Sequence, residues 1–167
     1  MQTVFQPLQS ASLDPLSARD ASVLLANART LQRVAGAGGS NALLHGKNFG
    51  LLCQSEHGED ASRFRRAATG LGAHVAHIRP SLSDLSAAGV IVDTARMLGR
   101  LYDGIECQGF APEFVKRLGD AAGVPVYRGL ASAEHATARL AESLDGAGPA
   151  DESRNYMIQS VLLSTVG

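Results

Sequence analysis

The apolar positions of the chain follow two spacings in turn. Between residues 20 and 35 they recur at helical spacing, and Gly36, Gly38 and Gly39 follow, so we expect an amphipathic helix there. Residues 48–54 then form a short apolar run that is typical of a buried strand. Residues 59–70 return to helical spacing and end in glycines. The predicted repeating unit is thus a strand followed by a helix.

This strand and helix unit recurs three more times. The predicted strands and the helices that follow them span residues 74–78 and 87–101, 104–107 and 112–122, and 124–127 and 133–144. Short apolar strands separated by helices need crossover connections, so the strands run parallel and helices cover both faces of the sheet. The predicted fold class is α/β, with a four-stranded parallel sheet in the middle of three layers.

The last part of the chain has a different pattern. Residues 145–151 are rich in Gly, Pro and Ala and indicate a linker. Residues 156–166 place Ile158, Val161 and Leu162 on one helical face. We therefore expect a final helix with one apolar face that docks on another surface.

Composition narrows the class of protein. The 167 residues suit one domain, and a net charge of −1 gives no indication of a nucleic-acid partner. No stretch is long and apolar enough for a membrane span, and the first residues do not resemble a signal peptide. Cys53 and Cys107 lie in apolar runs, as free buried thiols do. We expect a cytoplasmic protein with no membrane partner.

One long segment resembles a known family. Residues 93–109, Asp-Thr-Ala-Arg-Met-Leu-Gly-Arg-Leu-Tyr-Asp-Gly-Ile-Glu-Cys-Gln-Gly, are similar to the ornithine carbamoyltransferases of the aspartate/ornithine carbamoyltransferase family. Further similar segments, in the family's order, are residues 46–48, 71–75 and 122–127. Residues 153–166 resemble the helix that closes these enzymes.

The resemblance implies a domain organisation. Residues 1–144 correspond to the carbamoyl-phosphate-binding domain, and residues 153–167 to a C-terminal helix that docks on it. Residues 145–152 stand as a linker where the family has its amino-acid-binding domain, and the family's His-Cys-Leu-Pro motif does not occur in the sequence. About half of such an enzyme is therefore expected in this chain.

The family's phosphate-binding run, Ser-Thr-Arg-Thr-Arg, is replaced. By the resemblance its positions are those of His57, Gly58, Glu59, Asp60 and Ala61. None of the five matches. Glu56, Glu59 and Asp60 put negative charge at a helix N-terminus, where acids suit the helix dipole and repel phosphate. We expect a degenerate, acidic site without the arginines that would hold a phosphate.

The other positions that the resemblance assigns to the site are also changed. Gln108 stands where the family has an arginine. The family's His-Pro-Thr-Gln motif keeps His135 and Thr137, which are the remnant of its catalytic set, but has Ala138 in place of the glutamine. A loop that enters the neighbouring subunit's site in the family has Asp84 and Ala88 at its two functional positions.

These losses are large in energy. A charge-assisted hydrogen bond contributes about 1.5–3 kcal/mol, so losing four or five forfeits on the order of 6–15 kcal/mol. Micromolar binding amounts to only about 8 kcal/mol. We therefore expect no carbamoyl phosphate binding at useful concentrations.

Several residues have a simpler interpretation beside the functional one. His135 either polarises a carbonyl oxygen, as in the family, or caps the start of a helix, and we prefer the cap. His57 and Glu59 are a weak indication of a metal or acid–base site, and a solvated helix start is preferred. We expect no metal and no cofactor.

Two groups of charged residues are interpreted as structural. The arginine cluster of Arg63, Arg65 and Arg66 either binds an anion or, as we expect, pairs with the acids at positions 56, 59 and 60. Asp93, Arg96 and Arg100 predict a ladder of surface ion pairs along one helix.

The predicted function is an ornithine carbamoyltransferase-like protein, from a family of amino-acid metabolism and arginine biosynthesis, that lacks catalysis and acts as an oligomeric or partner-binding subunit. The resemblance implies a homotrimer through the first domain, with a full-length carbamoyltransferase as a further partner. Two alternatives stay open. The crevice is reused for a different small ligand, or a separate partner domain restores residual carbamoyl transfer.

Overall fold

The computed structural model describes residues 5–8, 13–39, 42–84, 86–144 and 148–167. Four parallel strands form one sheet in the order β2-β1-β3-β4. Their bounds are β1 (Asn48–Leu52), β2 (His74–Ile78), β3 (Gly104–Cys107) and β4 (Val126–Arg128). The predicted parallel α/β sheet is confirmed, with β1 and β3 at its centre.

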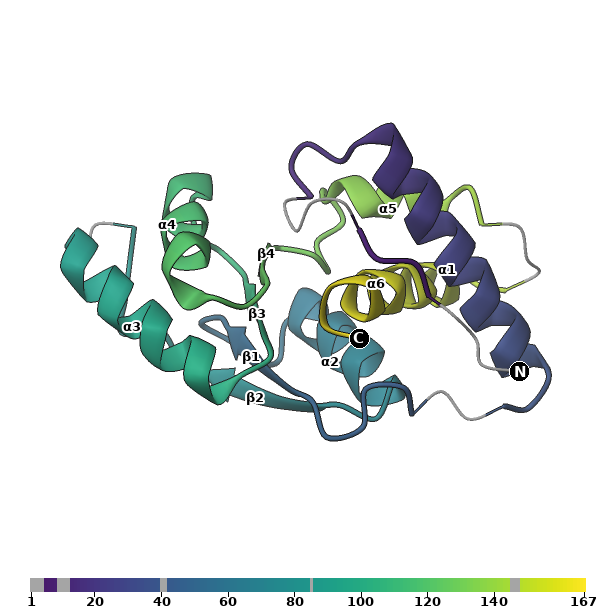
Figure 1. The fold of residues 1–167 in the computed structure, drawn as a ribbon, viewed down its shortest axis with the longest axis horizontal. Coiled ribbons are helices and arrows are strands. Elements are labelled where there is room, and N and C mark those ends of the chain that lie inside the picture. The colour runs from purple at the N-terminus through teal and green to yellow at the C-terminus, as the bar shows by residue number, and fades with distance from the viewer. Residues whose placement is uncertain (1–4, 9–12, 40–41, 85, 145–147) are drawn as a thin grey trace.

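Helices cover both faces of this sheet (Figure 1). One face carries α3 (Ala88–Leu101) and α4 (Pro112–Ala122). The other side holds α1 (Ala18–Gly36), α2 (Glu59–Gly70), α5 (Ala136–Ala141) and α6 (Ala150–Val166). The alternation of side chains in β1 explains the two cores, because Phe49 and Leu51 face the α2 side while Leu52 faces α3 and α4.

Several element bounds differ from the sequence prediction, and at three elements the difference has a clear local reason. β4 begins at Val126, not at residue 124, and Pro125, which has no N–H, contributes only its carbonyl oxygen to Ile105 N. Helix α5 is shorter than the predicted 133–144, because a turn precedes it and His135 caps it. Helix α6 starts earlier than residue 156, directly after Pro149.

Helix α6 lies between α1, α2 and α5, and every residue from Met157 to Leu163 is buried. The prediction of one apolar face is therefore wrong, since the stretch from Met157 to Leu163 is buried on all sides of the helix. Two polar side chains are accommodated there. Gln159 Nε2 donates to Ala67 O at 3.1 Å, and Ser160 Oγ donates to Leu24 O at 2.8 Å. Hydrogen bonds to backbone carbonyls thus tie α6 to α2 and α1.

Three further predictions concern the cysteines, a membrane span and the linker. Cys53 and Cys107 are free and buried, as predicted. Within the described ranges, no helix has the length and apolarity that crossing a bilayer requires. Of the predicted linker, residues 145–147 lie outside the described part of the chain.

Candidate site at the carboxyl ends of the strands

The predicted site residues lie where β1, β3 and β4 end and their following segments begin. Residues 57–61 form the start of α2, with Gly58 as an N-cap that offers no side-chain hydrogen bond. His57, Gly58 and Glu59 are exposed, Asp60 is half-buried and Ala61 is buried. The side chain of His57 is 88% exposed, so it points into solvent and takes no part in an enclosed site.

The acids of this segment pair with arginines of α2. Arg63 Nη1 lies 3.3 Å from Asp60 Oδ1, and Arg65 Nη2 lies 3.4 Å from Glu56 Oε2. The predicted ion pairs are confirmed for these two arginines. Arg63 Nη1 also donates to the carbonyl oxygen of Ala131 at 2.9 Å, so this guanidinium joins α2 to the segment after β4.

A carboxylate that the sequence analysis did not single out lies at the centre of the site. Glu106, on β3, is fully buried on the sheet face opposite α3 and α4. Its Oε1 accepts from Leu130 N at 3.0 Å and its Oε2 accepts from Ala131 N at 3.1 Å. Burial raises the pKa of Glu106 to about 7, although both backbone hydrogen bonds oppose the shift. The sequence signal was an acid inside the apolar strand 104–107.

The segment between β4 and α5 carries the histidine remnant. His135 is the N-cap of α5, and its Nδ1 accepts from Thr137 N at 3.2 Å and lies 2.8 Å from Thr137 Oγ1. Burial, followed by the charges of Arg154 and Arg128, lowers the pKa of His135 to about 4, so the ring is neutral at pH 7. The capping interpretation is confirmed. Thr137 is buried, and Ala138 next to it is half-buried.

A second residue outside the predicted set reaches this segment from α6. Arg154 Nη2 donates to Ser132 O at 2.7 Å, and its Nη1 lies 3.4 Å from Thr137 Oγ1. Burial lowers the pKa of Arg154, and the charge of Arg63 adds to the effect. The sequence signal was that Arg154 is the single basic residue of α6.

Two arginines from outside the positions that the resemblance assigned nevertheless lie beside the predicted site. Arg63 and Arg154 donate to the carbonyl oxygens of the adjacent residues Ala131 and Ser132, in the segment from Gly129 to His135. These residues are not the family positions that the resemblance assigned. Together with Glu106, they hold that segment from three different elements.

The remaining predicted residues form no hydrogen bond with the described residues of the segment from Gly129 to His135. Gln108, directly after β3, is half-buried, and its Nε2 lies 3.4 Å from Glu106 Oε2. Asp84 Oδ1 accepts from Ala111 N at 3.0 Å, which ties the loop to the start of α4 in the same chain. Ala88 begins α3 and is exposed. Among the described residues, no three side chains of metal-ligating type come together.

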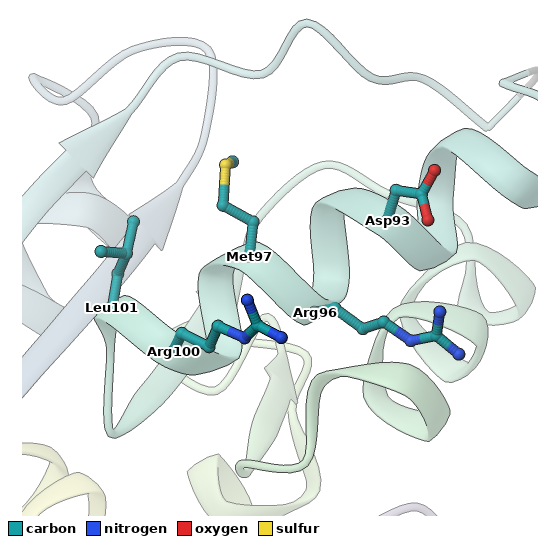
Figure 2. A pocket seen from close by; sticks show the side chains of 5 residues that line it. All are labelled: Asp93, Arg96, Met97, Arg100 and Leu101. Carbon is teal, nitrogen blue, oxygen red and sulfur yellow. The ribbon is translucent and has the colours of Figure 1, made fainter.

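Two surface hollows lie elsewhere on the molecule. The first, of about 350 Å³, follows the outer face of α3 and is lined by Asp93, Arg96, Met97, Arg100 and Leu101 (Figure 2). The second, of about 280 Å³, adjoins it at Leu101 and lies over the starts of β1 and β2. Neither hollow is lined by a residue of the predicted site. The predicted ion-pair ladder of Asp93, Arg96 and Arg100 is wrong, because the described structure has no ion pair among them.

Comparison with known proteins identifies the family. Residues 9–145 match the sequence model of the family described as aspartate/ornithine carbamoyltransferase, carbamoyl-P binding domain. The chain is 40% identical over 126 residues to an ornithine carbamoyltransferase of Haemophilus influenzae, strain PittGG, which covers 75% of this chain and 38% of that protein. An ornithine carbamoyltransferase of Cutibacterium acnes is 38% identical over 133 residues, covering 80% of this chain and 40% of that protein.

Solved structures agree. The ornithine carbamoyltransferase of Pyrococcus furiosus has a TM-score of 0.64 at 26% identity, over 83% of this chain and 44% of that one. The enzyme of the same name from Gloeobacter violaceus has a TM-score of 0.58 at 30% identity, over 79% and 41%. The chain thus spans about two fifths of the length of the curated relatives it matches. With its parallel sheet and with most of its length inside the family match, the chain belongs to the aspartate/ornithine carbamoyltransferase family.

Proposed function

We propose that this domain is a non-catalytic carbamoyltransferase homologue that acts as an oligomeric or partner-binding subunit. One observation carries the proposal: at the carboxyl ends of the strands, the polar groups are bonded to the chain's own backbone. Arg63 and Arg154 donate to carbonyl oxygens, Glu106 accepts two backbone N–H groups, and His135 caps a helix.

The charges at the start of α2 support the same conclusion. Residues 57–61 offer no guanidinium and no hydroxyl group to a phosphate. Glu56 and Asp60 occupy the guanidinium groups of Arg65 and Arg63 instead. A phosphate that recruited Arg63 would have to break its bond to Ala131 O and approach Asp60, and leaving a buried polar group unpaired costs about 1–3 kcal/mol.

The assembly is part of the proposal. We place the protein in the cytoplasm as a homotrimer through this domain, alone or mixed with a full-length carbamoyltransferase, and in the setting of arginine biosynthesis. Support comes from family membership and from the named relatives, which are ornithine carbamoyltransferases.

A second candidate function has an observation in its favour. The guanidinium groups of Arg63 and Arg154 donate to the carbonyl oxygens of two adjacent residues, Ala131 and Ser132. Two neighbouring positive charges favour an anion beside them, so the segment after β4 is a candidate site for a small anion other than carbamoyl phosphate. A thermal-shift screen of phosphate and small carboxylates tests this function, because a saturable rise in Tm that Arg154→Met abolishes supports it.

Activity and mass together test the first proposal. The protein is incubated with carbamoyl phosphate and ornithine, alone and with an added full-length carbamoyltransferase, and citrulline is measured against a blank without this protein. We expect no citrulline from the protein alone, and a trimer mass in sedimentation. Citrulline above the blank, or a monomer at all concentrations, contradicts the proposal.

A further inference from the structure

The outer face of α3 combines apolar exposure with unpaired charge. Four large hydrophobic side chains of the described residues are notably exposed, and three of them belong to α3: Val90 at 52%, Met97 at 54% and Leu101 at 60%. Positions 90, 97 and 101 fall on one side of a helix. The buried residues of α3, Ile91, Ala95 and Leu98, face α4 and the sheet instead. The outer stripe therefore covers nothing within the described chain.

Charged residues accompany this stripe in a definite order. Asp93 lies in its N-terminal half, and Arg96 and Arg100 lie toward its C-terminal end. Figure 2 shows Met97 and Leu101 rising from one side of the helix, with Arg96 and Arg100 extended along the neighbouring side. None of the three charged side chains has an ion pair or a side-chain hydrogen bond with any other described residue. Within the described part of the chain, both the apolar and the charged groups of this face therefore lack a partner.

The order of the charges makes the face complementary to itself. If a second α3 lies antiparallel on the first, a two-fold axis near Met97 brings Asp93 of each copy opposite Arg100 of the other. The two residues are seven positions apart, about 10 Å along the helix, so both pairs form at once. The helix dipoles then also run in opposite directions, which is favourable.

The apolar groups fit the same register. Met97 of one copy meets Met97 of the other beside the axis. Val90 comes to the end of the partner helix near Leu101 and Tyr102, where the second surface hollow of about 280 Å³ begins. A side chain from outside thus enters a concave surface at each end of the helix pair.

We infer that the outer face of α3 is an isologous contact surface, and that its occupant is α3 of a second copy of this chain. A different protein would need an acid opposite Arg100 and a base opposite Asp93 at the same separation, and this chain already supplies both. The inference names a contact for the proposed subunit role. It does not depend on the lack of catalysis, which the citrulline assay tests separately.

The contact is expected to be weak. One helix pair buries less than the about 1,200 Å² at which stable interfaces begin, so we expect a dissociation constant on the order of 10–100 µM. The contact joins two copies of whatever oligomer the rest of the chain forms. A monomer becomes a dimer, and a trimer becomes a hexamer.

Charge reversal tests both the contact and its register. Sedimentation velocity is measured over about 5–500 µM for the wild type, Asp93→Arg, Arg100→Asp and the double variant. Each single variant sets like charges opposite one another, and we expect its dissociation constant to rise at least about tenfold. The double variant, and an equimolar mixture of the two single variants, restore opposite charges and should recover the doubling.

Controls keep the result specific. Arg29→Asp, an exposed charge reversal on α1, should leave the doubling unchanged. Circular dichroism confirms that each variant is folded. The inference is overturned if the wild type shows no concentration-dependent doubling of mass, if single reversals have no effect, or if neither the double variant nor the mixture recovers it.

Discussion

The carboxyl-end cluster of Arg63, Glu106, His135 and Arg154 and the outer face of α3 treat polar groups in opposite ways. In the cluster, the side chains are buried or half-buried and are bonded to the chain's own backbone. On α3, exposed charges and apolar groups lie side by side and have no partners among the described residues. The comparison teaches that arginine, glutamate and histidine side chains at the carboxyl ends of the strands can serve the fold alone. A helix face outside that cluster is the surface that is open to contacts with another molecule.

The largest effect is expected from removing the buried carboxylate. Glu106→Ala leaves the N–H groups of Leu130 and Ala131 buried without an acceptor, at about 1–3 kcal/mol each. We expect the free energy of unfolding to fall by about 2–6 kcal/mol in urea denaturation. Glu106→Gln, which keeps one acceptor oxygen, should lose less. Equal stability of Glu106→Ala and the wild type would show that the carboxylate does not hold the segment after β4.

The pH dependence separates Glu106 from His135. The pKa of Glu106 rises from 4.5 to about 7 on folding, so its contribution to stability is complete below pH 4.5 and is lost as the pH rises through 7. The pKa of His135 falls from 6.5 to about 4, so its contribution is present above pH 6.5 and is lost as the pH falls through 4. Each contribution is on the order of 3 kcal/mol.

The two slopes oppose one another between pH 4.5 and 6.5. Relative to the wild type, the unfolding free energy of Glu106→Gln should therefore rise with pH over this range, and that of His135→Asn should fall. Urea unfolding at a series of pH values measures the differences, in which other groups cancel. Profiles of both variants that run parallel to the wild type contradict the assignment.

A smaller effect contrasts the inner face of α3 with its exposed start. A Cβ at Gly99 would overlap the carbonyl oxygen of Ala122 on α4, whereas a Cβ at Gly89 meets nothing within 4 Å. We expect Gly99→Ala to lower the unfolding free energy by about 1–3 kcal/mol through overpacking. Gly89→Ala, in the same helix, should leave it unchanged or raise it by up to about 1 kcal/mol. Thermal unfolding of the two variants should thus give shifts of different sign or size, and a stable Gly99→Ala variant would refute the close packing of α3 on α4.

The smallest effect is expected on the outer stripe. Met97→Ser and Leu101→Ser remove apolar groups that are already more than half exposed. We expect changes in unfolding free energy within about 0.5 kcal/mol, as is usual for surface substitutions. Dilute samples and urea denaturation measure this without the contribution of self-association. A larger loss would mean that the stripe is covered within the chain itself.

The sequence predicted the fold well where the hydrophobic pattern and the positions of glycine and proline agree. The bounds of α2, β2, β3 and α4 coincide with the predicted ranges 59–70, 74–78, 104–107 and 112–122. Glycines end two of these elements and Pro112 begins α4, so the boundaries can be predicted from the residue types. β4 was misplaced at Pro125, since hydropathy alone does not register a missing N–H.

The site was predicted less completely, because its key contacts join distant segments. Glu106 was overlooked within an apolar strand, and its role depends on N–H groups at positions 130 and 131. Arg154 comes from the last helix and reaches the segment after β4 through three-dimensional packing. His135, in contrast, was interpreted correctly as a cap, because its partner Thr137 is two residues away.

The central claim, that the cluster at the carboxyl ends serves the fold and not a phosphate, has one direct test. Carbamoyl phosphate and inorganic phosphate are each titrated into the wild type and Arg154→Met in a calorimeter. Ligand concentrations up to about 10 mM detect binding free energies as weak as about −4 kcal/mol. The account predicts no saturable heat for either ligand. Saturable binding of one phosphate per chain to the wild type, abolished in Arg154→Met, would contradict it.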